Sequence, residues 1–175
     1  MRNMDLFMEY IVKHKRSGQD TLKIVGIIAA AVVLAAVSSL MLAFPLVQSL
    51  WLLVIVGIIY GAFFLIKRTN VEFEYIMTNN ELDIDKIMAK SSRKRLVTVD
   101  FKEIDIMAKV DDAEHKSEYN SIDSSTKVLD CTGDGMTDIY FVDLSNGDGK
   151  VRVLFQPPMK LLEAAKKYNP RKIFI

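Results

Sequence analysis

The longest uncharged stretch of the chain runs from Ile24 to Ile66 and contains no Asp, Glu, Lys, Arg or His. As one helix, these 43 residues would reach about 65 Å, at about 1.5 Å per residue. A bilayer core is about 30 Å thick and needs about 20 residues per span. The stretch therefore fits two spans. The alternative is a pair of buried helices in a soluble protein, but such helices carry a polar stripe that this stretch lacks.

A break between the two spans is expected at Pro45. Proline cannot donate a backbone hydrogen bond, and its ring clashes with the preceding helical turn. Gln48 and Ser49 follow as a polar pair. We therefore predict a membrane α-helical hairpin with one transmembrane helix at 22–44 and the other at 46–66.

Small side chains indicate how the spans pack. Gly57 and Gly61 form a GxxxG pattern in the second span, and Ala31, Ala35 and Ser39 recur at intervals of four in the first. Small residues let helix backbones approach closely in lipid. The pattern fits packing of the two spans against each other, and it also fits a homodimer interface.

Basic residues flank the hairpin on both sides, and the segment between the spans is uncharged. The flanking bases are Lys13, Lys15, Arg16 and Lys23 before the first span, and Lys67 and Arg68 after the second. Because basic flanks stay on the cytoplasmic side, we expect a multi-pass protein of the plasma membrane with both termini in the cytoplasm. The single cysteine, Cys131, cannot form an internal disulfide, which agrees with a reducing compartment.

Residues 1–21 are interpreted as a cytoplasmic amphipathic leader. Apolar side chains recur there at helical spacing, and they are Met4, Phe7, Met8, Ile11 and Val12. This spacing predicts a short helix. Two positions remain open for it, on the membrane surface or packed on the soluble domain.

Residues 71–175 are expected to form a mainly-β cytoplasmic domain. From Val71 to Met77 apolar and polar residues alternate, and similar runs recur as far as residue 156. Residues 111–125 are polar and acidic and are expected to form a long loop. Asn146 and Gly147 open a hairpin turn. The pattern predicts about seven strands.

A helix is expected after the last strand. Pro157 and Pro158 suit its first turn. Its apolar stripe is Met159, Leu162, Ala165 and Tyr168, and Asn169-Pro170 ends it.

Three short segments resemble the bacterial pleckstrin-homology-like (PH-like) proteins. They are Tyr75-Ile76-Met77-Thr78-Asn79-Asn80-Glu81-Leu82, Phe101-Lys102-Glu103-Ile104, and the ending Tyr168-Asn169-Pro170-Arg171-Lys172. The whole chain is similar to a family of small bacterial membrane proteins with two spans before such a domain. The resemblance implies a PH-like seven-strand barrel with a C-terminal helix, and it implies no catalytic residues.

One basic cluster is a candidate binding site. Lys90, Arg93, Lys94 and Arg95 gather at the turn between the second and third expected strands of the soluble domain. Such a turn could contact anionic lipid headgroups, at about 1 kcal/mol per basic residue near the surface. The alternative is a solvated turn.

Catalytic and metal-binding patterns are weak. Asp130, Thr132, Asp134, Gly135 and Asp138 match positions of an EF-hand loop. The position that needs a bidentate Glu is Phe141, so an ordinary acidic turn is expected. Ser, Cys and His do not combine into a nucleophile pattern. We expect no catalytic, cofactor or metal site.

The resulting hypothesis is a non-enzymatic, membrane-anchored binding module that presents a PH-like domain at the inner face of the membrane. Its expected partners are the lipid bilayer, anionic headgroups and a protein, and a homodimer is an option. The net charge of +1 argues against a nucleic-acid partner. The alternatives are an accessory subunit of a larger membrane complex, assembled through the hairpin, and an enzyme acting on lipid.

Overall fold

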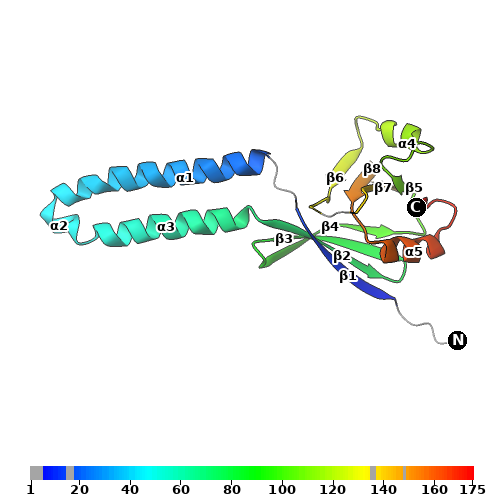
Figure 1. The fold of residues 1–175 in the computed structure, drawn as a ribbon, viewed down its shortest axis with the longest axis horizontal. Coiled ribbons are helices and arrows are strands. Elements are labelled where there is room, and N and C mark those ends of the chain that lie inside the picture. Colours follow the sequence, from blue (N-terminus) through cyan, green and yellow to red (C-terminus); the bar gives the residue numbers. More distant parts are fainter. Residues whose placement is uncertain (1–5, 15–17, 135–136, 148) are drawn as a thin grey trace. The chain divides into compact units, whose positions relative to one another are not determined.

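A computed structural model describes residues 6–14, 18–134, 137–147 and 149–175. The chain forms two compact units (Figure 1). The helical unit comprises Arg16–Val71 and Met88–Lys90. The head unit comprises Met1–Lys15, Glu72–Ile87 and Ser91–Ile175.

The helical unit consists of α1 (Gly18–Ser38), the 3-10 helix η1 (Ser39–Ala43), α2 (Pro45–Gln48) and α3 (Trp51–Arg68). The segments Gly18–Ala43 and Trp51–Arg68 are long and apolar enough to cross a membrane. The predicted break at Pro45 is confirmed, because Phe44 has extended backbone and Pro45 begins a new helix. Proline is favoured there since the first helical residues need no amide donor.

The helices α1 and α3 pack against each other. On α1 the partly covered residues include Ala31 and Ala35, two of the small residues expected at a helix contact, whereas Ser39 is exposed. A Cβ atom added at Gly57 or Gly61 would meet nothing within 4 Å. The contact between α1 and α3 therefore does not use the close approach that the GxxxG pattern permits.

The head contains eight strands in its described residues, arranged in two four-stranded sheets (Figure 1). The first sheet has the order β1-β2-β3-β4 and the second has the order β5-β7-β8-β6. The strands are β1 (Phe7–Lys13), β2 (Val71–Thr78), β3 (Glu81–Met88), β4 (Ser92–Asp100), β5 (Ile106–Lys109), β6 (Lys127–Asp130), β7 (Tyr140–Asn146) and β8 (Gly149–Phe155). The prediction of a mainly-β domain is confirmed, but its described strands form two sheets and not clearly the predicted seven-strand barrel, because β1 is an additional strand and β6 pairs with β8 in parallel.

The predicted leader helix is wrong, because residues 7–13 form strand β1. This strand pairs antiparallel with β2, with Tyr10 opposite Tyr75 and Val12 opposite Phe73. Val12 is buried, and the two tyrosine rings lie 6.4 Å apart. Pairing satisfies the backbone groups of β2 and buries Val12, which an isolated surface helix would not do.

The helical hairpin is inserted into a β-hairpin of the head. Lys13 at the end of β1 lies opposite Glu72 at the start of β2, in the place where two antiparallel strands are ordinarily joined by a short turn. The head is therefore not confined to residues 71–175. It begins before the first apolar helix and resumes after the second.

The head core joins both sheets to the C-terminal helix α5 (Met159–Tyr168), which confirms the predicted helix. Its fully buried side chains include Tyr75, Phe101, Phe141 and Phe155 from the strands and Leu161, Leu162 and Ala165 from α5. The Tyr75 hydroxyl donates to the Cys131 carbonyl (2.6 Å) and accepts from the Gln156 amide (3.2 Å). This ties β2 to the segments that flank the second sheet.

Candidate membrane-surface site

The turn between β3 and β4 belongs to the helical unit as far as Lys90. Ala89 and Lys90 have φ values of 54° and 57°, as in the tight turns that join antiparallel strands. The Ala89 amide donates to the Asn70 carbonyl, just beyond α3, at 3.0 Å. This bond holds the exposed Lys90 beside the end of the second apolar helix.

The last turn of α3 carries two more bases over aromatic rings. The Lys67 ammonium lies 4.6 Å from the centre of the Phe63 ring, and the Arg68 guanidinium lies 4.9 Å from that of Phe64. Cations are favoured at a helix C-terminus, and aromatic and basic residues favour the membrane–water interface. The bond from Ala89 to Asn70 places Lys90 near the same end of α3, and we call Lys67, Arg68 and Lys90 the basic cluster.

The predicted cluster at Lys90–Arg95 is divided by its ion pairs. Arg93 donates to Glu74 at 3.0 Å. Arg95 contacts Asp83 at 2.6 Å and Asp85 at 2.8 Å. Lys90 and Lys94 are exposed and make no ion pair with any residue that the structure describes. Both arginines therefore act within the first sheet, whereas the lysines remain available to an anion.

The acidic partners of these arginines were not singled out by the sequence. Glu74, Asp83 and Asp85 alternate with core residues of β2 and β3, so the pattern describes them only as an exposed face. The Glu74 side chain has no exposed surface. Its pKa is raised, first by burial and then by the neighbouring Glu9 carboxyl. Arg93 reaches Glu74 across β3, so this pairing depends on the order of the strands in the sheet, which periodicity does not give.

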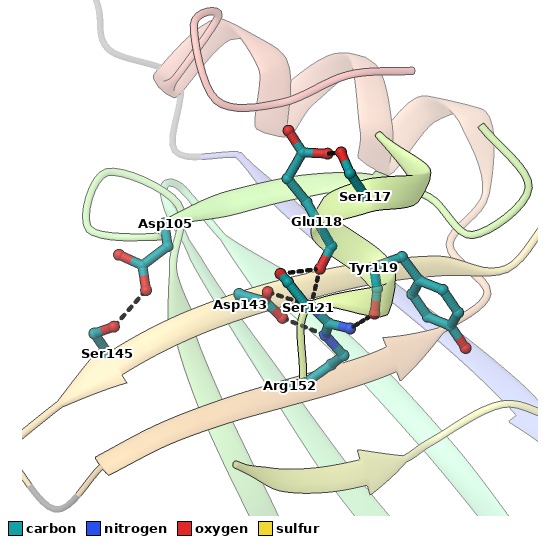
Figure 2. A network of polar contacts seen from close by, with 8 residues as sticks. All are labelled: Asp105, Ser117, Glu118, Tyr119, Ser121, Asp143, Ser145 and Arg152. Atoms are coloured by element: carbon teal, nitrogen blue, oxygen red, sulfur yellow. Dashed lines mark hydrogen bonds and ion pairs between the residues drawn. The ribbon is translucent and has the colours of Figure 1, made fainter. Parts of the chain in front are cut away.

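A second polar cluster surrounds Arg152 on β8 (Figure 2). Its guanidinium donates two bonds to Asp143 on β7, each at 2.6 Å, and bonds the carbonyls of Glu118 and Tyr119 in α4 (Lys116–Asn120). It also lies over the rings of Tyr119 and Phe141. Because its hydrogen bonds are used within the chain, Arg152 holds α4 to the sheet and is not open to a ligand.

Among the hollows of the head, two are lined by described residues alone, and neither of these two contains a recognisable reaction centre. One, of about 220 Å³, adjoins Arg152 and is lined by Asp105, Thr126 and Ser145 among others. The other, of about 500 Å³, is lined by acidic residues, Lys166 and His115. The Nδ1 atom of His115 lies 2.6 Å from an Asp112 carboxylate oxygen, and the His115 ring packs against the Phe174 ring.

The residues of the EF-hand-like segment and Cys131 make contacts within the fold. Within the described part of the chain, no group of three or more His, Cys, Asp or Glu residues could hold a metal ion. Asp130 accepts bonds from Thr132, and Asp138 pairs with Lys109, while Gly135 lies outside the described residues. Burial raises the pKa of the Cys131 thiol to about 12, which makes it a poor nucleophile.

Together the fold and the cluster define a class of protein, a mainly-β head that carries an apolar helical hairpin with a basic end. The chain belongs to the family described as Bacterial PH-like domain (DUF6106), whose model matches residues 4–175. The family resemblance is thereby confirmed, and the match includes β1 and the hairpin. No curated protein and no solved structure matches the chain.

Proposed function

We propose that this protein is a non-enzymatic binding module, anchored by its hairpin at the inner face of the plasma membrane, that binds anionic lipid headgroups. The observation that supports it is the cluster of Lys67, Arg68 and Lys90 at one end of the apolar helices. A headgroup phosphate would meet two ammonium groups and one guanidinium there. Each contributes about 1 kcal/mol near an anionic surface.

Lys90 is the residue to test, because Lys67 and Arg68 also flank the second span and would affect its orientation. The Lys90→Ala variant should bind phosphatidylglycerol about fivefold more weakly than wild type, which corresponds to about 1 kcal/mol. The measurement is native mass spectrometry of the full chain from mixed phosphatidylglycerol and phosphatidylethanolamine, comparing the lipids retained. The difference should shrink as salt rises, since exposed charges are screened.

Lys127→Ala is the matched control, because Lys127 is an exposed lysine on β6 in the head unit. It removes the same charge and should retain lipid as wild type does. Equal retention of phosphatidylglycerol by wild type and Lys90→Ala at low salt would rule out Lys90 as a headgroup contact.

One observation favours a second function, an accessory subunit of a larger membrane complex. The open space over Gly57 and Gly61 leaves the GxxxG pattern free to contact another helix. Purification in mild detergent distinguishes the two functions. A second polypeptide in stoichiometric amount favours the subunit, and the chain with lipid alone favours the module.

A further inference from the structure

Two carboxyl groups meet on the strands that carry the helical hairpin. Glu9 lies on β1 opposite Ile76, and Glu74 lies on β2 opposite Ile11. The two glutamates are therefore diagonal neighbours on one face of the sheet, within reach of each other's long side chains. Glu9 is exposed, whereas the Glu74 side chain has no exposed surface.

The hydrogen bonds of Glu74 are incomplete. Its Oε1 atom accepts from Arg93 at 3.0 Å, but its buried Oε2 atom has no hydrogen-bonding partner among the described residues. The Glu9 side chain, diagonal to Glu74 in the strand register, is the long polar neighbour that can reach Oε2 and form a hydrogen bond with it. Two ionised carboxylates have no hydrogen to share, so this bond requires that one of them be protonated.

The surrounding charges favour that proton. Arg93 on β4 is the base that faces Glu74, and it is largely exposed. Glu9 on β1 and Asp85 on β3 add negative charge, and Arg95 is already paired with Asp83 and Asp85. Burial, Glu9 and Asp85 raise the pKa of Glu74 from its ordinary value of 4.5, against the lowering effect of Arg93.

We propose that Glu9 and Glu74 bind one proton between them and that this proton fastens β1 to β2. The ligand is a proton and not a metal ion, since no cluster of three metal-binding side chains occurs in the part of the chain described. Because α1 follows β1 and α3 precedes β2, the proton controls the pairing of the two strands that enter and leave the hairpin.

The sign of the pH dependence follows from linkage. A carboxyl whose pKa is higher in the folded state stabilises that state fully below its unfolded pKa, and this stability is lost as pH rises through the folded value. The pairing of β1 with β2 should therefore be firm at acidic pH and should weaken as pH rises above 4.5.

The test is hydrogen exchange of the β1 amides in the full chain, in nanodiscs at pH 5, 6, 7 and 8, corrected for intrinsic exchange. Wild type should lose protection of β1 as pH rises. Glu74→Gln, which mimics the protonated acid, should show a flat profile. The control Glu81→Gln removes an exposed carboxylate at the start of β3 and should behave as wild type.

A second variant and a spectroscopic measurement test the shared proton independently. Glu9→Gln alters an exposed side chain and should move the loss of β1 protection to lower pH, whether or not Glu74→Gln folds, because burial and Asp85 still raise the pKa of Glu74. Infrared spectroscopy over the same pH series should show the stretching band of a protonated carboxyl persisting to higher pH in wild type than in Glu74→Gln. A wild-type profile in Glu9→Gln, or a band that disappears at the same pH in wild type and Glu74→Gln, would overturn the proposal.

Discussion

Arg152 shows how one side chain can fix a segment that has few buried residues of its own. None of the five residues of α4 is buried, and its N-terminus has no side-chain cap. The guanidinium supplies donors to two of its carbonyls while Asp143 balances the charge (Figure 2). A planar guanidinium suits this task because it can pair with a carboxylate through two bonds and still donate elsewhere.

Replacing Arg152 by Met should destabilise the head by about 3 kcal/mol, since Asp143 would lose its partner and α4 its donors. Thermal unfolding of the full chain in detergent measures this. Lys150→Met, an exposed position on the same strand, is the control and should change stability by less than about 0.5 kcal/mol. Equal melting of the two variants would mean that Arg152 is dispensable to the fold.

The sequence could not predict that Arg152 is buried and bound to α4. Lys150 and Arg152 occupy alternate positions of β8, a pattern typical of a strand face in water. Arg152 is buried because α4 lies over it, within the segment 111–125 that composition describes only as a polar loop. Which loop covers which strand face depends on tertiary packing.

At the scale of elements, β1 shows where periodicity is ambiguous. Phe7, Met8, Ile11 and Val12 fit one face of a helix, but as a strand they place Phe7 and Ile11 on one side and Met8 and Val12 on the other. The deciding contact is with β2, which lies beyond the entire hairpin in sequence. By contrast, the sequence predicts β2, β3, β8 and α5. In each of these, the spacing of apolar residues fits either a strand or a helix but not both.

Without the hairpin, the head should reach its full stability only when β1 is kept. We expect residues 6–14 joined to residues 71–175 by a short turn to show mainly β circular dichroism and a cooperative melt. Residues 71–175 alone should be less stable by at least about 1.5 kcal/mol, the contribution of one buried Val side chain, and should aggregate through the bare edge of β2. Equal melting temperatures for the two chains would show that β1 is not part of the head's fold.

At the scale of the whole molecule, the insertion constrains the topology. Both ends of the hairpin belong to neighbouring strands of one sheet, so we expect both to lie on the same side of a membrane. This agrees with two spans, as the uncharged stretch predicts. The basic residues at that end favour the cytoplasmic side, because Lys and Arg near span ends are retained there.

Cysteine labelling in intact cells tests this topology. Gln48, the last residue of α2 between the two apolar helices, and Ser125, on the head, are both exposed, whereas the native Cys131 is buried and should not react. With a membrane-impermeant maleimide, Gln48→Cys should react from outside, whereas Ser125→Cys should react only after permeabilisation. Labelling of Ser125→Cys in intact cells would reverse the orientation. Protection of both until permeabilisation would mean that the hairpin enters the membrane without crossing it, because a break that crosses must emerge on the far side.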